Sequence, residues 1–321
     1  MLITIMLFVV GLIFLIKGGD WFVDGATSIA HRFHVPELLI GATVVSIGTT
    51  LPEVMVSATS AVSGHGEIAY GNAIGSIICN TALIAALTIA VKPSKVNGKT
   101  FKTPVIFFFI AAAFYMFNAY MYRYFGRISG VVLLSIFIVY MIYTVLQVKK
   151  ETETQISSDA DEGSGSGIKD TLLLAAGAAL IAVGANLLVE NGTLIAEAIG
   201  VPESVIALTF VALGTSLPEL VTAITSLVKG HSALSLGNII GANLFNIVLV
   251  NGVSAALAPF NIPESKTIAG INVSLVVDFP VMLFVMLFLT IPALVNKRLS
   301  RFQGIVLLLI YLSFCILQFI L

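Results

Sequence analysis

The sequence Gly-Thr-Thr-Leu-Pro-Glu at residues 48–53 returns at residues 214–219 as Gly-Thr-Ser-Leu-Pro-Glu. Each copy lies in the middle of an apolar run, 38–62 for the first copy and 204–228 for the second. Both runs are long enough to cross a bilayer, which takes about 20 mostly apolar residues. A carboxylate at that depth is energetically costly and usually marks a functional site. Glu53 and Glu219 are therefore the first candidates for such a site.

The composition predicts an integral membrane protein. Hydrophobic residues make up 58% of the 321 positions and charged residues 10%, whereas soluble domains carry roughly 25% charged residues. The net charge of −1 offers no basic face for nucleic acid. The two cysteines, Cys79 and Cys315, lie in apolar runs and indicate neither a disulfide framework nor a metal cluster. Because the first charged residue is Lys17, the N-terminal segment is interpreted as a retained span, not a cleaved signal peptide.

Ten segments are apolar and long enough to be transmembrane helices, so we expect an all-α fold. In the first half they cover 2–30, 36–62, 67–91, 103–122 and 127–148, and in the second half 170–198, 203–229, 232–258, 272–295 and 302–320. Between the halves, residues 149–169 are acidic and contain a Gly-Ser-Gly-Ser-Gly run, which is typical of a flexible linker. This predicts an N-terminal five-helix repeat at 1–148 and a C-terminal five-helix repeat at 170–321.

The two halves are related in sequence at a constant offset of 166 residues. This offset relates Val35 to Val201, Gly48 to Gly214, and Asp24 to Glu190. Since each repeat has five spans, an odd number, the second copy must enter the membrane inverted. Inverted repeats are a transporter architecture, with the substrate site near the midplane between interrupted helices.

The placement of lysine and arginine predicts the orientation of the chain. Loops after the odd-numbered spans hold twelve of these residues, and loops after the even-numbered spans hold three. Because basic loops stay in the cytoplasm, we expect both termini outside the cell membrane and the 149–169 linker in the cytoplasm.

The first motif has the chemistry of a cation site. Pro52 lacks a backbone N–H, so the carbonyl of Gly48 loses its helical partner, which predicts a helix break near Thr49 and Thr50. Free carbonyl and hydroxyl oxygens at membrane depth are tolerated where they face a cavity or an ion. Glu53 follows one turn later, and this set of oxygens suits a hard cation. The second repeat supplies the equivalent set from Thr215, Ser216 and Glu219.

A second repeated motif lies on the next span of each half, at residues 71–80 and 237–246. Its glycines are spaced four residues apart, which allows close helix packing; they are Gly71 and Gly75, and Gly237 and Gly241. The motif ends in Asn80 in the first repeat and Asn246 in the second. Two glutamates and two asparagines about a pseudo-two-fold axis would form a compact four-cornered site.

The charge of this site gives a physical basis for exchange. Two carboxylates that face each other repel, and they bind protons unless a cation neutralises them. A divalent cation, two monovalent cations or protons would each serve. The unloaded, doubly charged site is costly to reorient across an apolar midplane, so only loaded forms should switch.

These motifs resemble those of the cation/calcium exchanger superfamily, specifically its sodium/calcium exchanger branch, and the similarity covers nearly the whole chain. The resemblance implies that Glu53 and Glu219 bind Ca²⁺ with the carbonyls of Thr49 and Thr215, next to Asn80 and Asn246. It implies that Na⁺ ions bind beside them while the first and sixth spans slide together. The residues it implies for Na⁺ are the Thr50 and Ser216 hydroxyls, the side chains at Ser76 and Ala242, and the Ser46 and Ala212 carbonyls.

Two positions depart from the family pattern. Asn246 stands where some prokaryotic relatives have aspartate, which is compatible with sodium dependence. Ala242 stands where a serine hydroxyl is usual, so one sodium position loses a ligand. This leaves proton/calcium antiport on the same scaffold open as an alternative. A cation channel is a second alternative; an intramembrane enzyme has no nucleophile or metal motif to support it.

The remaining polar residues have ordinary structural interpretations. The motif glutamates could cap half-helices, the asparagines could bond between helices, and Thr50 and Ser216 could bond to their own backbone. Asp20, Asp24 and Glu190 are expected at the interface or at helix ends, where Lys17 could pair with them. His65 and His231 are expected in surface turns, and Asp278 is expected to be a snorkelling or kink-associated residue. We expect no cofactor. The expected partners are lipid, Ca²⁺ and Na⁺, and one chain holds a complete site.

Overall fold

A computed structural model describes residues 1–155, 167–199, 214–264, 267–268 and 270–320. Within this part of the chain, nine helices are long and apolar enough to cross a membrane. They match nine of the ten predicted spans. The tenth, predicted at 203–229, lies partly outside the described residues, and its described part contains the shorter apolar helix α11 (Leu217–Val228). Helices dominate because a segment in lipid must satisfy its backbone hydrogen bonds internally.

Several spans contain a π-helical turn between two α-helical pieces. In the first half the helical elements are α1 (Leu2–Arg32), α2 (Glu37–Ile40), η1 (Gly41–Val45), α3 (Ser46–Val62), α4 (Gly66–Cys79), η2 (Asn80–Ala85), α5 (Ala86–Val91), α6 (Gly98–Tyr122) and α7 (Arg127–Gln155). In the second half they are α8 (Gly167–Ala198), α11, α12 (Ser232–Phe245), η4 (Asn246–Val250), α13 (Asn251–Leu257), η5 (Ser274–Asp278), α14 (Phe279–Asn296) and α15 (Arg301–Ile320).

Short strands connect loops outside the helices. Strand β1 (Tyr124–Phe125) pairs antiparallel with β2 (Phe260–Asn261), so the loop after α6 is joined to the loop after α13. Strand β3 (Thr267–Ile268) pairs antiparallel with β4 (Ile271–Asn272).

Helix α7 continues past the predicted end of its span, to Gln155, and α8 begins at Gly167. The predicted linker therefore begins with helix. The lysine, glutamate and glutamine residues there are good helix formers, so leaving the bilayer does not by itself end the helix. The glycine- and serine-rich centre of the linker lies outside the described residues.

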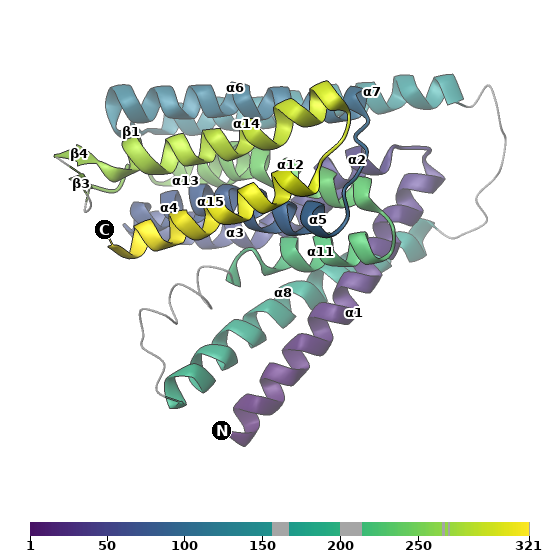
Figure 1. The fold of residues 1–321 in the computed structure, drawn as a ribbon, viewed down its shortest axis with the longest axis horizontal. Helices are drawn as coiled ribbons and strands as arrows, with labels where there is room; N and C mark the ends of the chain where they lie inside the picture. The colour runs from purple at the N-terminus through teal and green to yellow at the C-terminus, as the bar shows by residue number, and fades with distance from the viewer. Residues whose placement is uncertain (156–166, 200–213, 265–266, 269, 321) are drawn as a thin grey trace.

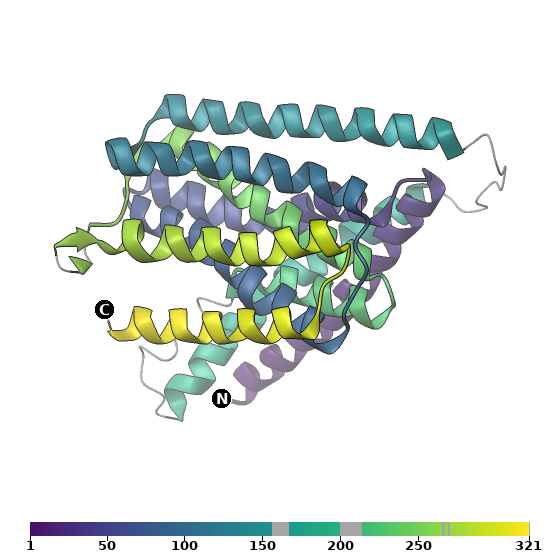
Figure 2. The same cartoon turned by 45° about the horizontal axis from the view of Figure 1, so that its top comes forward.

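The chain termini lie at one end of the helix bundle, and the C-terminal end of α7 lies at the opposite end (Figure 1). This is the arrangement expected when an even number of spans separates the termini and an odd number precedes the linker. In both views, α1 and α8 form a pair that is inclined to the other helices (Figures 1 and 2).

The α1–α8 pair is antiparallel and packs through glycine. A Cβ on Gly11 would lie 2.9 Å from the Gly184 carbonyl oxygen, and one on Gly18 would lie 2.9 Å from the Gly177 carbonyl oxygen. The offset of 166 relates Gly11 to Gly177 and Gly18 to Gly184. The interface is therefore built from equivalent positions of the two repeats, which fits the inverted repeat predicted from sequence. Small residues at these positions let the two helix backbones approach closely.

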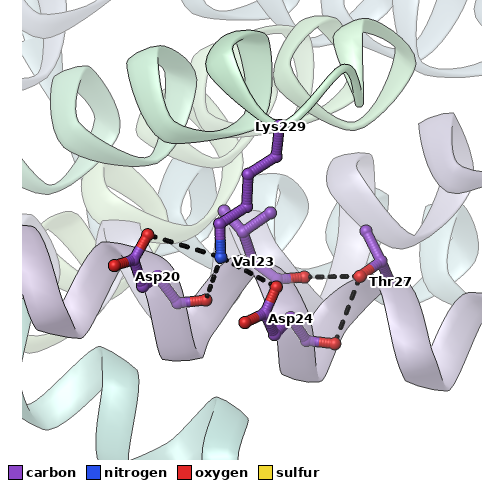
Figure 3. Close-up of polar contacts among 5 residues, drawn as sticks. All are labelled: Asp20, Val23, Asp24, Thr27 and Lys229. Atoms are coloured by element: carbon purple, nitrogen blue, oxygen red, sulfur yellow. Dashed lines mark hydrogen bonds and ion pairs between the residues drawn. The ribbon is translucent and has the colours of Figure 1, made fainter.

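Ion pairs join the ends of these helices. Lys229, directly after α11, places its Nζ 2.8 Å from Oδ1 of Asp24 and 3.3 Å from Oδ1 of Asp20, both on α1 (Figure 3). Arg32 at the end of α1 pairs with Asp170 at the start of α8, with 2.9 Å between Nη2 and Oδ2. The expected pairing of the α1 carboxylates with Lys17 is therefore wrong. Lys229, which is distant in sequence, pairs with both Asp20 and Asp24.

Candidate functional site

The two repeated glutamates meet in the interior. Glu53 on α3 and Glu219 on α11 are both 0% exposed, and their carboxyl groups interact with each other. Thr49 and Thr50, which belong to the first repeat, lie beside the carboxyl group of Glu219 from the second. The fold thus brings the two copies of the motif into one cluster, as the repeat symmetry predicts.

Many polar atoms of this cluster have no protein partner. Among the described residues, none of the four carboxyl oxygens of Glu53 and Glu219 has a hydrogen-bond partner of normal geometry. The same holds for the Thr50 and Ser216 hydroxyls, for both amide atoms of Asn80 and for Oδ1 of Asn246. Buried polar groups normally have partners, and burial without one costs several kcal/mol. Capping or interhelical bonding would supply such partners, so those structural interpretations do not account for this cluster.

The local backbone differs between the repeats. In the first repeat α3 runs unbroken from Ser46 to Val62 with Pro52 inside it, so the predicted break near Thr49 and Thr50 is wrong there. The irregularity lies earlier, in the π-helical turn η1, where the Ser46 hydroxyl donates to the Gly41 carbonyl at 2.7 Å. A proline is tolerated in a membrane helix when neighbouring turns and hydroxyls adjust around it.

In the second repeat the described residues have a turn at the equivalent position, and the segment before Gly214 lies outside the described residues. Thr215 and Ser216 form a turn, and α11 begins after them with Pro218 in its first turn. Proline fits the first turn of a helix, where its missing N–H has no intrahelical role.

The two motif asparagines each open a π-helical turn. Asn80 begins η2 and Asn246 begins η4, at equivalent positions of the two repeats. Both side chains are 0% exposed. Within this site Nδ2 of Asn246 donates to the Ala242 carbonyl of its own helix at 3.0 Å, which leaves Oδ1 available. π-Helical turns occur frequently at functional sites because they redirect backbone and side-chain groups.

Asn238 is a positioning residue that the sequence reasoning missed. Its Oδ1 lies 3.2 Å from the Thr49 hydroxyl and 3.3 Å from the Ser46 hydroxyl, so it connects α12 to α3 beside the glutamates. The equivalent residue, Asn72, donates from Nδ2 to the Ser57 hydroxyl at 2.9 Å. The available signal was the occurrence of asparagine at the second position of both Gly-Asn motifs.

A second set of positioning residues has no repeat signal. Asn251 donates from Nδ2 to the Asn246 carbonyl at 3.0 Å, and its Oδ1 accepts from the Tyr115 hydroxyl at 3.1 Å. These bonds hold the first residue of η4 against α6. The equivalent of Asn251 in the first repeat is Ala85, which explains why repeat comparison gives no indication of it.

The motif glycines differ between repeats. Gly237 and Gly241 pack directly against the backbone of Leu38 and Ala42, as their spacing predicts. The equivalent residues Gly71 and Gly75 have no atom within 4 Å of an added Cβ, so the expected close helix contact is wrong for them. They line open space instead.

That open space reaches the site from one side. A cavity of about 390 Å³ is lined by Gly71, Gly75, Ser76, Thr215 and Gln318, among others. A neighbouring cavity of about 490 Å³ shares Gly71, Gly75 and Gln318 and adds the carboxylates Glu67 and Asp278. Because Gln318 lies near the C-terminus, the two cavities approach the cluster from the end of the bundle where the termini lie.

The remaining candidate residues take simple positions. Ser46, Ser76 and Ser216 are buried and Thr215 is partly buried, whereas Ala212 lies outside the described residues. His65 and His231 precede α4 and α12 as turn residues, and His231 also contacts Glu37 at 2.8 Å. Both cysteines are free.

Across the described residues, no group of three or more histidine, cysteine, aspartate or glutamate side chains forms a metal cluster. Any cation in the site would therefore need hydroxyl, amide and carbonyl oxygens as ligands too.

Two inverted halves, a polar cluster buried between them and a cavity that reaches it from one side are the features of a membrane ion transporter. Comparison with known proteins places the chain within that class. The sequence profile described as "Sodium/calcium exchanger protein" matches residues 3–146 and 169–320. The chain belongs to this sodium/calcium exchanger family.

Individual relatives agree over almost the full length. The chain is 30% identical to "Sodium/calcium exchanger MaX1" of Methanosarcina acetivorans, covering 99% of both chains. It is 33% identical to "Putative antiporter CaxA" of Alkalimonas amylolytica, again covering 99% of both. A solved structure of the sodium-calcium exchanger NCX_Mj, soaked with Na⁺ and Sr²⁺, matches with a TM-score of 0.81, 32% identity and 97% coverage of both chains.

Proposed function

We propose that the protein is a sodium/calcium antiporter that works by alternating access. The observation that carries this proposal is the pair Glu53 and Glu219, two fully buried carboxyl groups from opposite repeats that interact with each other without hydrogen-bond partners. Such a pair is costly when unneutralised, and one Ca²⁺ between the carboxylates removes the cost. Hard oxygen ligands are what Ca²⁺ prefers.

The proposed ion ligands follow from the geometry and the family resemblance. Ca²⁺ binds the Glu53 and Glu219 carboxylates and the Thr49 and Thr215 carbonyls, with Asn80 and Asn246 beside it. Na⁺ replaces it by using the orphan hydroxyls of Thr50 and Ser216, the Ser76 side chain, and the Ser46 and Ala212 carbonyls. One chain supplies every ligand, so a single chain is the working unit.

The different environments of the repeated glycines support alternating access. Around Gly71 and Gly75 the protein is open, and around Gly237 and Gly241 it is closed. Because the repeats are inverted, exchanging these two environments would close the present opening and open the opposite side. The two five-helix units 1–148 and 170–321, joined by the 149–169 linker, provide this symmetry. The glycine-packed α1–α8 pair is the element proposed to slide.

We place both termini outside the cell and the linker in the cytoplasm, on the lysine and arginine distribution. In this orientation the cavities beside Gly75 open to the outside. Ca²⁺ and Na⁺ from the external solution would then reach Ser76 and Thr215, which line the inner cavity.

A proton/calcium antiporter is the second candidate, because one specific residue favours it. Ala242 removes a hydroxyl from the proposed Na⁺ ligands, and it is fully buried. Two observations favour sodium over protons. The unpartnered Thr50 hydroxyl next to Glu219 can replace the missing Na⁺ ligand. The name of the 30% identical relative, "Sodium/calcium exchanger MaX1", also favours sodium.

The test uses the purified protein in proteoliposomes. We expect an outward sodium gradient at equal internal and external pH to drive Ca²⁺ uptake. Uptake driven only by a pH gradient would transfer the assignment to proton/calcium antiport, and Ca²⁺ flux that needs no counter-ion would indicate a channel.

A further inference from the structure

A further groove lies on the outside of the α1–α8 pair, away from the ion site and its two cavities. It has a volume of about 530 Å³ and is lined by Ile13, Phe14, Lys17 and Trp21 of α1 and by residues of α8 that include Ala176 and Val183. None of the proposed ion ligands lines it. Small alanine side chains on α8 leave a trough between the two helices.

Lys17 is the charged residue of this groove, and it is exposed. Within the described residues it has no ion pair or hydrogen bond. The carboxylate one turn further along α1, Asp20, is instead held by Lys229, with 3.3 Å between Nζ and Oδ1. A cation in an apolar groove on the lipid-facing side therefore lacks a protein counter-charge, which is costly unless an anion from the membrane supplies one.

The depth of Lys17 is set by its neighbours. Lys229 directly follows the last residue of α11, so it marks the end of a span, and its Nζ lies 3.1 Å from the carbonyl oxygen of Asp20 (Figure 3). That turn of α1 is therefore at the polar boundary of the bilayer. Lys17 lies one turn deeper, and Trp21, the single tryptophan of the chain, is at the boundary, where tryptophan is favoured. Residues 2–16 carry no charge.

We propose that this groove binds an anionic phospholipid from the leaflet on the linker side of the membrane. The Lys17 side chain extends toward the membrane boundary, where its ammonium group pairs with the lipid phosphate beside the Trp21 indole. One acyl chain fills the trough between Ile13 and Phe14 on α1 and Ala176 and Val183 on α8, directed toward the membrane centre. The lipid is seated on both helices of the pair at once, and its binding does not depend on which ions the protein carries.

Because Trp21 is the sole tryptophan, its fluorescence reports on this groove alone. The wild-type protein is reconstituted in phosphatidylcholine vesicles that contain a small fraction of lipid with brominated acyl chains, which quench nearby tryptophan. Brominated phosphatidylglycerol should associate with the groove roughly fivefold more strongly than brominated phosphatidylcholine, as one interfacial lysine contributes about 1 kcal/mol. Equal quenching by the two lipids overturns the proposal.

Two variants separate the headgroup from the acyl chain. Lys17→Gln should reduce phosphatidylglycerol quenching to the level of phosphatidylcholine, whereas Lys102→Gln, an exposed lysine on α6, should leave the preference unchanged. Ala179→Phe fills the trough and should lower the preference with Lys17 intact. Retention of the full preference by Lys17→Gln or by Ala179→Phe contradicts the proposal. Abolition of the wild-type preference by inorganic phosphate in the buffer would show a bare anion site instead.

Discussion

Gly75 and Gly241 occupy the same position in the two repeats, yet Gly75 borders an open cavity while Gly241 is packed against Ala42 and the Ser46 hydroxyl. The same residue type at equivalent positions is therefore next to open space in one repeat and tightly packed in the other. An inverted-repeat protein that is open on one side and closed on the other must show such a difference, since the two sides use equivalent residues.

Gly75→Leu should separate folding from transport. The position has no neighbouring atom within 4 Å of an added Cβ, and leucine is a better helix former than glycine by almost 1 kcal/mol. The melting temperature in detergent should therefore be kept or raised, while Ca²⁺ uptake is lost because the cavity cannot close.

The matched control is Gly241→Leu, which places a large side chain against backbone and should destabilise the protein by at least about 1–3 kcal/mol. Normal Ca²⁺ uptake by Gly75→Leu, or equal destabilisation by the two substitutions, would be inconsistent with a closure at this glycine.

Asn238→Ala should weaken both stability and Ca²⁺ transport. It removes the amide oxygen next to the Thr49 and Ser46 hydroxyls, and buried groups left unpaired cost about 1–3 kcal/mol. We expect a lower melting temperature and a higher KM for Ca²⁺. Asn72→Ala, at the equivalent but only partly buried position, should raise the KM less. The reverse order would remove Asn238 from the positioning of the site.

The ion pair of Lys229 with α1 should be weak. Its side chain is 26% exposed and that of Asp24 is 54% exposed, and partly exposed pairs contribute about 0.2–1 kcal/mol. A double-mutant cycle with Lys229→Gln and Asp24→Asn, read from detergent unfolding, should give a coupling energy in that range and decreasing with salt. No coupling at low salt would mean that Lys229 does not fasten α1 to α11.

Ala242→Ser should strengthen the sodium dependence of Ca²⁺ uptake. The substitution restores a hydroxyl at a fully buried position beside the proposed Na⁺ ligands, so the sodium concentration for half-maximal exchange should fall. Ser76→Ala is the converse control and should raise it. An unchanged sodium dependence in Ala242→Ser would show that the hydroxyl at this position is not a ligand.

The fold and the centre of the site were predictable because they depend on patterns that lipid enforces. Apolar length indicates the spans, and repetition at one offset indicates that Glu53 and Glu219 meet. The unbroken course of α3 through Pro52 was not predictable, since it depends on a π-helical turn closed by Ser46. Contacts between distant segments, such as Lys229 with Asp24, also follow from helix packing that no local pattern encodes.

The central claim, that Glu53 and Glu219 share one cation, is tested most directly by equilibrium Ca²⁺ binding to the purified protein. We predict one Ca²⁺ per chain in the wild type and an affinity lower by at least roughly tenfold in both Glu53→Gln and Glu219→Gln, because each loses a charge that faces the ion in a medium of low dielectric. Both variants should melt no lower than the wild type, since each relieves a buried charge. Wild-type Ca²⁺ affinity in either variant would contradict a shared site.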